Sequence, residues 1–269
     1  RTRSRAMGMH QTSVYVGTIA GSTFAALIGQ YYGWRWAFLI FGIMGMLLGL
    51  ALYKFLVEPE RGAADRADLD AGQAAPAYVK LGIGETMRVI WSTPTAIILM
   101  GAFLCSNFVA AVVLAWMPFY LHEKFHYSLA KAALFGTLFL QLASMAGSPL
   151  GGWLADNLRR RFAGGRLLVQ ATAVLLAAPF VFLVGSTSSE VVLITGLIGW
   201  GLFKGFYDAN IFASAYDVVR PEARGTTAGF MNCIGWLGGG GTAPIVIGYI
   251  ADRYSLGFGI ALEIGRAHV

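Results

Sequence analysis

Seven long apolar runs dominate this sequence, and they decide the solvent in which the chain folds. An α-helix needs about 20 residues to cross the hydrocarbon core of a bilayer, and each run is close to that length or longer. Strands of a membrane barrel would be shorter and would alternate apolar with polar residues, so we predict an all-α polytopic membrane bundle. The predicted spans are residues 11–31, 35–57, 94–120, 130–154, 167–186, 190–215 and 225–250, and an eighth begins near Ser255.

The basic residues predict how the chain lies across the membrane. Hydrophobic residues make up 57% of the chain and charged residues 13%, which is too apolar for an ordinary soluble domain. If the N-terminus is cytoplasmic, fourteen basic residues fall inside and four outside, which follows the positive-inside rule. The net charge of +6 therefore reflects topology, and we expect no nucleic-acid partner. The inner set is Arg1, Arg3, Arg5, Lys54, Arg61, Arg66, Lys80, Arg88, Arg159, Arg160, Arg161, Arg166, Arg220 and Arg224, and the outer set is Arg35, Lys124, Lys131 and Arg253.

The residues that usually carry catalysis or bind metals form no recognisable pattern. Cys105 and Cys233 both lie within predicted spans, where we expect small buried hydrophobes rather than a disulfide or a metal pair. No Cys/His spacing is typical of zinc, and no glycine-rich loop follows a strand to hold a nucleotide. The histidines are scattered, so a catalytic triad has no support. We expect no metal, no cofactor and no enzymatic activity.

A polar segment divides the predicted spans into two groups. Residues 58–85 are rich in Ala, Gly and mixed charges, which is typical of a cytoplasmic linker, and a short interfacial helix is expected at 84–91. The last seven residues, EIGRAHV, can be read back into a common sequencing adapter, so we expect a non-native tail; the alternative is a genuine polar chain end. The predicted divisions are 1–57, the linker 58–92, 93–262 and the tail 263–269.

Three motifs, in order along the chain, resemble those of the major facilitator superfamily of transporters. GWRWAF at residues 33–38 is similar to the turn between the fifth and sixth helices of that family. GGWLADNLRRR at 151–161 is similar to its cytoplasmic signature between helices eight and nine. VVRPEARGTTAGFMN at 218–232, followed by GWLGGGGTAPIVIGYIADR, resembles the loop before helix eleven and that helix.

The resemblance implies a fold of twelve helices in two six-helix halves, of which this chain would hold helices five to eleven and the start of twelve. It also implies secondary active transport by alternating access, with helices one to four outside the sequence. One position departs from the pattern: the fifth-helix signature usually ends in Gly-Pro, whereas Gln30 follows Gly29 here. This departure leaves the direction of transport open.

Two charged residues stand inside the sixth predicted span. A charge near the bilayer centre costs about 2.5 to 3.5 kcal/mol on insertion scales, so Lys204 and Asp208 need an explanation. Their four-residue spacing places them on one face of a helix, where they can form an ion pair. The pair could serve burial alone, or this face could line a cavity between the halves. In the second case the lysine would favour an anionic substrate, and the aspartate could exchange its partner or a proton.

Uncharged polar residues in the spans are further candidates for substrate binding. These could hydrogen-bond a sugar-like or carboxylate solute, or they could be helix-packing contacts. The candidates are Asn107, Gln141, Ser144 and Asn232.

The signature at 151–161 and the glycine pairs predict moving parts. The resemblance implies that Gly152, Asp156, Arg159, Arg160 and Arg161 belong to a conformational latch between the halves; the alternative is a topological anchor. Glycines four residues apart predict close helix approach, and consecutive glycines before a proline predict a helix that can bend. The glycine pairs are 17/21, 29/33, 147/151, 201/205 and 235/239, and the predicted bend comprises Gly238, Gly239, Gly240, Gly241 and Pro244.

These features together predict a secondary active transporter of a small organic solute, preferably an organic anion, coupled to a proton or another ion. A non-transporting membrane receptor or regulator on the same scaffold is the main alternative. An intramembrane enzyme is a third class, but it would need a cluster of His, Asp or Ser that Lys204 and Asp208 alone do not make.

Overall fold

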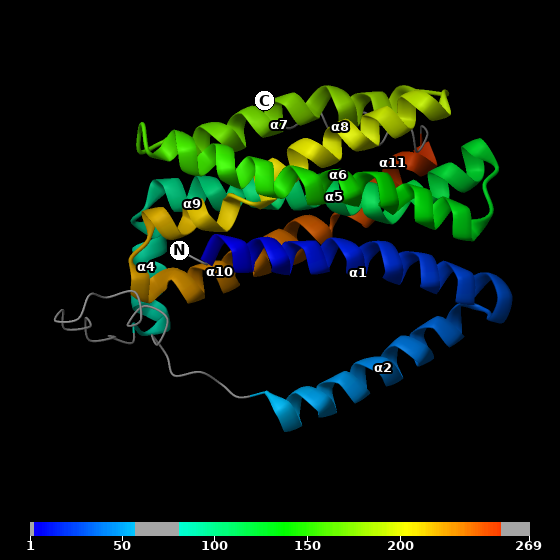
Figure 1. Cartoon of the computed structure of the whole chain (residues 1–269), viewed down its shortest axis with the longest axis horizontal. Helices are drawn as coiled ribbons and strands as arrows, with labels where there is room; N and C mark the ends of the chain where they lie inside the picture. The colour runs from blue at the N-terminus through cyan, green and yellow to red at the C-terminus, as the bar shows by residue number, and fades with distance from the viewer. Residues whose placement is uncertain (1–2, 57–80, 254–269) are drawn as a thin grey trace.

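The computed structural model describes residues 3–56 and 81–253, and every regular element in these two ranges is helical (Figure 1). Long helices run side by side and alternate in direction, so the connections gather at the two ends of a bundle. The elements are α1 (Arg3–Tyr32), α2 (Trp34–Phe55), α4 (Ile83–Trp91), α5 (Pro94–Phe125), α6 (Leu129–Arg159), α7 (Gly165–Ser186), α8 (Glu190–Asp208), α9 (Ile211–Val218), η1 (Pro221–Ala223), α10 (Arg224–Cys233), η2 (Ile234–Gly240) and α11 (Ala243–Arg253).

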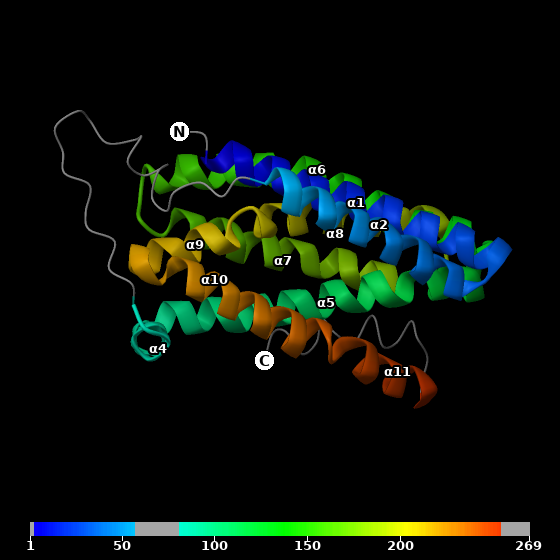
Figure 2. The same cartoon turned by 90° about the horizontal axis from the view of Figure 1, so that it is seen from below.

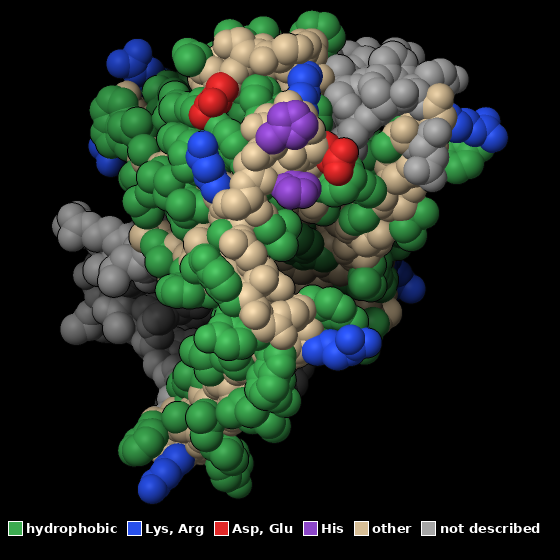
Figure 3. Space-filling view, turned by 90° about the vertical axis from the view of Figure 1, so that its right-hand side faces the viewer, with side chains coloured by type: hydrophobic (Ala, Val, Ile, Leu, Met, Phe, Trp, Pro, Cys, Tyr) green, Lys and Arg blue, Asp and Glu red, His purple; other side chains and the backbone are tan. Residues whose placement is uncertain are grey.

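Seven stretches of the described helices are long and apolar enough to cross a membrane, and this confirms the seven predicted spans. Predicted and observed ends differ by a few residues, most at the third span, which continues to Phe125, and at the fourth, which continues to Arg159. Hydrophobic side chains form much of the outer surface, as a lipid-facing surface requires (Figure 3). The observed spans are Gln11–Tyr32, Trp34–Phe55, Pro94–Phe125, Leu129–Arg159, Gly165–Ser186, Glu190–Val218 and Pro221–Ala251.

Helix α6 is the centre of the packing. It contacts α1 on one side and α8 on another, and α8 in turn packs against α7. The view from below shows α1 running along α6, with α5 alongside the α10–η2–α11 span (Figure 2). Helix α2 lies at the edge against α1, and Ala37 is its buried residue in the described chain. This arrangement brings α1 next to the face of the bundle that carries Lys204 and Asp208.

Glycines bring the backbones of α6 and α8 into contact. A Cβ atom placed at Gly147 would lie 2.2 Å from the backbone oxygen of Leu202, and one at Gly205 would lie 2.3 Å from that of Ser144. Such distances leave no room for any larger side chain, so close approach is confirmed for the pairs 147/151 and 201/205. The pair 235/239 approaches α5 in the same way. The prediction is wrong for 17/21 and 29/33, where a Cβ would meet no described atom within 4 Å.

The glycine run in the last described span changes the helix type. Ile234–Gly240 forms a π-helix between α10 and α11, with wider turns than an α-helix. The Gly241 N–H donates to the Trp236 carbonyl oxygen over 2.7 Å, which is the five-residue step of this geometry. The predicted irregularity is therefore present at Gly238, Gly239 and Gly240, whereas bending during transport remains a prediction.

Two expectations need correction. The span predicted as one helix at 190–215 is broken, because α8 ends at Asp208 and α9 begins at Ile211. Cys105 and Cys233 are exposed on the chain rather than buried, since their helix faces point away from the core. The short helix predicted at 84–91 is confirmed as α4, where Glu85 accepts from the Gly82 N–H over 3.3 Å. Most of the linker, the start of a twelfth helix and the tail 263–269 lie outside the described residues.

Candidate functional site

The ion pair between Lys204 and Asp208 lies inside the sixth membrane-spanning stretch. The lysine Nζ contacts the aspartate Oδ2 one helical turn away, and the side chains are only 13% and 16% exposed. The predicted intrahelical pair is therefore confirmed. Partial burial weakens the screening of these charges by water, so they attract each other more strongly than an ion pair at a protein surface.

A tyrosine from another helix completes this group. The Tyr15 hydroxyl on α1 donates to Oδ2 of Asp208 over 3.2 Å, so that oxygen receives both the lysine and the tyrosine. The Lys204 Nζ also lies 5.7 Å from the centre of the Tyr15 ring, within the range of a cation–π contact. Tyr15 is only 2% exposed. Our sequence interpretation missed this residue, although a tyrosine about one turn inside a predicted span was a usable signal.

On α6, Gln141 is a candidate for substrate binding because its side-chain oxygen has no hydrogen-bond donor in the described chain. Its side chain is 3% exposed, and its Oε1 has no partner among the described residues. One turn before it, Thr137 contacts Ser22 of α1, with 3.1 Å between the hydroxyl oxygens. Ser144 lies beside the carbonyl oxygen of Gly201 at 2.9 Å, which makes it a packing contact between α6 and α8. Gln141 thus carries a free acceptor on a helix that contacts both α1 and α8.

The two predicted asparagines bond to their own helices. The side-chain nitrogen of Asn107 donates to the Phe103 carbonyl oxygen over 2.8 Å, and that of Asn232 donates to Ala228 over 3.1 Å. Asn107 is buried against the π-helix, whereas Asn232 is exposed. No hydrogen bond or ion pair among the described residues joins either asparagine to Lys204 or Asp208.

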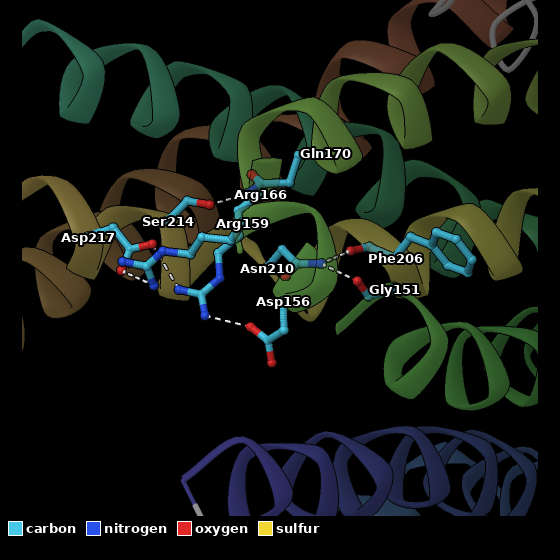
Figure 4. A network of polar contacts seen from close by, with 9 residues as sticks. All are labelled: Gly151, Asp156, Arg159, Arg166, Gln170, Phe206, Asn210, Ser214 and Asp217. Atoms are coloured by element: carbon cyan, nitrogen blue, oxygen red, sulfur yellow. Dashed lines mark hydrogen bonds and ion pairs between the residues drawn. The ribbon is translucent and has the colours of Figure 1, made fainter. Parts of the chain in front are cut away.

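A cluster of charged residues occupies the end of the bundle where α6 meets α7 (Figure 4). The Arg166 guanidinium on α7 contacts Asp156 of α6 at 2.7 Å and Asp217 of α9 at 2.8 Å. Arg159 pairs with Asp217 at 2.9 Å. Two predicted latch residues, Asp156 and Arg159, are therefore in one network. The sequence interpretation missed Arg166 and Asp217 as their partners, although an acidic residue just past a predicted span was a signal.

The remaining predicted latch residues take no part in these ion pairs. Arg160 and Arg161 are exposed and form no ion pair within the described part of the chain, and Gly152 lies near Ala209. All ion pairs described for this cluster join α6, α7 and α9, so the structure describes no pair from it to α1 or α2. A latch to the first group of helices therefore remains a prediction.

Polar side chains tie the same end of the bundle together beside the ion pairs. Asn210 stands in the break between α8 and α9 and donates to the carbonyl oxygens of Gly151, at 3.1 Å, and Phe206, at 2.9 Å (Figure 4). The Gln170 amide donates to the Ser214 hydroxyl. These bonds satisfy buried polar groups and fix α9 against α6 and α7. Among the described residues no group of three or more His, Cys, Asp or Glu could hold a metal ion.

Comparisons with known proteins agree with this architecture. The chain is 26% identical over 267 residues to a protein from Oryza sativa subsp. japonica named "Probable anion transporter 4, chloroplastic", with 94% of this chain and 43% of that protein covered. It is 25% identical over 281 residues to the D-galactonate transporter of Escherichia coli O6:H1, with 97% and 62% covered. The chain thus spans about half the length of the curated relatives it matches.

A solved structure has the same fold. It is a bacterial homologue of the human lysosomal transporter Spinster in an inward-facing and unoccupied conformation. The TM-score is 0.69 at 22% identity, over 98% of this chain and 62% of that one. The family model described as Major Facilitator Superfamily matches residues 1–244. With seven membrane-spanning stretches and this match, the chain is a multi-pass integral membrane protein that belongs to the major facilitator superfamily.

Proposed function

We propose that this chain forms part of a secondary active carrier that moves a small organic anion across a membrane by alternating access. The observation that carries the proposal is the ion pair of Lys204 and Asp208 inside a membrane-spanning stretch. In carriers of this kind the substrate site lies near the middle of the membrane, between two groups of helices. Because the chain spans about half the length of its curated relatives, transport is proposed for the complete carrier that contains it.

Energetics favour a role for the pair beyond burial. A charged residue at the centre of a membrane helix costs about 2.5 to 3.5 kcal/mol, and pairing recovers only part of that cost. Replacement of a buried pair by apolar residues is often neutral or stabilising, so a pair in this place contributes little to stability. We therefore explain the pair by function rather than by stability: it supplies two charged groups that can change partners.

The chemistry of Lys204 favours an anion. A lysine ammonium has three hydrogen-bond donors and no acceptor, so a substrate carboxylate or phosphate can compete with Asp208 for it. The relatives support this choice, since their names specify an anion and a sugar acid. The open acceptor of Gln141 would suit a hydroxyl group of the same substrate. A sugar acid combines both groups.

Coupling to a proton or another ion forms the second part of the proposal. When a substrate anion takes Lys204, Asp208 loses its cation, and a proton or metal cation could replace it. At the end of the bundle, Asp156 and Arg159 would belong to a latch that opens as the helices move. Their side chains are 45% and 43% exposed, whereas their partners Arg166 and Asp217 are 16% and 26% exposed, so water reaches one member of each pair and lowers the strength of the pairing.

Lys204→Ala in the complete carrier tests the proposal. Uptake of labelled D-galactonate, other sugar acids and inorganic phosphate is measured in proteoliposomes, with D-galactose as the neutral counterpart. Loss of a hydrogen bond to a charged group should lower the uptake efficiency of the transported anion about tenfold to hundredfold. Lys131→Ala is the matched control, because Lys131 carries the same charge but lies 3.6 Å from the centre of the Tyr127 ring near the end of the bundle. Unchanged anion uptake by Lys204→Ala would refute the role of this lysine.

A further inference from the structure

The Tyr15 hydroxyl and the Lys204 ammonium bind the same oxygen atom of Asp208. The two donors belong to different helices: Lys204 is on α8, as is the aspartate, and Tyr15 is on α1. While Lys204 is in place, the tyrosine is a second donor to a carboxylate oxygen that already has a cation. The hydroxyl therefore contributes least when the ion pair is intact.

The balance changes when the ion pair opens. A carboxylate that loses its cation inside a membrane bundle is left with whatever donors remain within reach. For Oδ2 of Asp208 the remaining donor is Tyr15, whose side chain is 98% buried and is held in place by packing. The other titratable group beside the carboxylate is Tyr207, whose hydroxyl has no hydrogen-bond partner among the described residues. Among the described residues, Tyr15 is the donor other than Lys204 for which the structure gives a hydrogen bond to this carboxylate.

We propose that Tyr15 is a positioning residue of the anion site. Its hydroxyl keeps its hydrogen bond to the Asp208 carboxylate while the substrate anion is bound to the Lys204 ammonium. This inference rests on the proposed function, since it assumes that an anion displaces Asp208 from the lysine. Tyr15 does not touch the substrate. Its hydroxyl lowers the free energy of the loaded state, because it replaces part of what the carboxylate loses. The hydroxyl also links α1 to α8, so binding of the anion changes a contact of α1, which belongs to the group of spans before the linker.

Tyr15→Phe tests this role, because it removes only the hydroxyl. The loaded state depends on that hydroxyl more than the empty state does, so the KM for the transported anion should rise about tenfold while the maximal rate stays within about twofold. The matched control is Ser22→Ala, which removes a hydroxyl of the same helix that contacts Thr137 at 3.1 Å and does not touch Asp208. That variant should keep the wild-type KM. An unchanged KM in Tyr15→Phe would overturn the inference.

A second measurement does not depend on transport. Thermal unfolding of the detergent-solubilised carrier is compared in a Lys204→Ala background, where the ion pair is absent, for that background alone and with Tyr15→Phe, Asp208→Asn or both. If the hydroxyl holds the carboxylate, the two substitutions are non-additive, whereas Ser22→Ala and Asp208→Asn add. Additive effects of Tyr15→Phe and Asp208→Asn would overturn the inference. If the wild type takes up no tested anion but the coupling is present, the proposed function fails and Tyr15 keeps its hold on Asp208.

Discussion

Nη2 of Arg166 lies 2.7 Å from Oδ1 of Asp156, so α7 is tied to α6 at the end of the bundle. Nη1 of the same guanidinium lies 2.8 Å from Oδ2 of Asp217. Arg166 is 16% exposed, whereas Asp156 is 45% exposed. A largely buried cation thus holds two carboxylates from two different helices, and its loss would take this partner from Asp156, whereas Asp217 would keep Arg159.

Arg166→Met should therefore destabilise the protein. Removal of one partner from a buried ion pair costs about 3 to 5 kcal/mol, and the exposure of Asp156 reduces this to about 1 to 3 kcal/mol. Thermal unfolding in detergent measures the effect. Arg160→Met is the control, because Arg160 is exposed and has no ion pair in the described chain, so its effect should stay within about 0.5 kcal/mol. Equal stability of the two variants would contradict this account.

Gly205→Ala should loosen the contact between α6 and α8. The added Cβ would lie 2.3 Å from the backbone oxygen of Ser144, which cannot move without a shift of the helix. We expect a loss of about 1 to 3 kcal/mol in unfolding free energy, measured by thermal or chemical unfolding. Gly21→Ala is the opposite case, because its Cβ would meet nothing within 4 Å in the described chain. That change should be neutral or slightly stabilising, since alanine favours a helix over glycine.

Gln141→Leu separates stability from substrate binding. The Gln141 Oε1 has no partner in the described chain, so its removal should leave stability unchanged or raise it. If this oxygen accepts a hydroxyl of a sugar acid, the KM for that substrate should rise about tenfold. Ser144→Ala should behave in the reverse way, with lower stability and an unchanged KM, because Ser144 bonds within the bundle. A Gln141→Leu carrier with the wild-type KM would remove this residue from the site.

Tyr127, in the loop between α5 and α6, should lower the stability of the protein at alkaline pH. Burial, together with the Glu190 carboxylate, raises the pKa of Tyr127 from 10.0 to about 12. Below about pH 10 the tyrosine is protonated in both states and has no effect. Between about pH 10 and 12 the unfolded chain loses this proton first, so stability falls as the pH rises. The other charged group at the ring is Lys131, with Nζ 3.6 Å from the ring centre.

Tyr127→Phe should remove part of this fall. Thermal unfolding of the variant and the wild type is compared at about pH 8 and about pH 11, and the variant should lose less stability between the two. Tyr53→Phe is the control, because Tyr53 is 91% exposed, and it should follow the wild type. A Tyr127→Phe curve parallel to the wild type would mean that the tyrosine has the same proton affinity in both states.

The orientation predicted from the basic residues can be tested by thiol labelling. Cys105→Ser and Cys233→Ser first remove the native thiols, which are both exposed. In this background a Lys124→Cys variant should react with a membrane-impermeant maleimide in intact cells, because Lys124 lies at the predicted outer end. An Arg160→Cys variant should react only after the membrane is permeabilised. The reverse pattern would invert the topology.

The positions of the spans and the Lys204–Asp208 pair could be predicted because both depend on neighbours along the chain. A span is a local run of apolar residues, and the pair joins residues four apart in one helix. The partners of Asp208 and Arg166 on other helices could not be found in this way. Tyr15 is 193 residues from Asp208, and Arg166 is 51 residues from Asp217. Such contacts depend on how the helices pack, which hydropathy does not specify.

The break after Asp208 was missed for a different reason. Residues 209–211 contain no proline or glycine, and a single asparagine, although it is common at a helix N-cap, is a weak signal inside an apolar run. The break depends instead on Asn210, which donates to the Gly151 carbonyl oxygen of α6 as well as to Phe206 of its own helix. The bond to α6 competes with continuous helix formation only after α6 and α8 have packed together.

The glycine contacts between α6 and α8 also have a consequence for the proposed substrate site. Two helices whose backbones touch at Gly147 and Gly205 have little freedom to slide, so they should move as one body. Lys204 and Gln141 stand on this shared body, so the distance between the backbone positions from which their side chains extend is set before any substrate arrives. The proposed site would therefore select anions by size. It would bind a molecule whose charged end and hydroxyl group are spaced to match that distance, whatever conformation the rest of the carrier adopts.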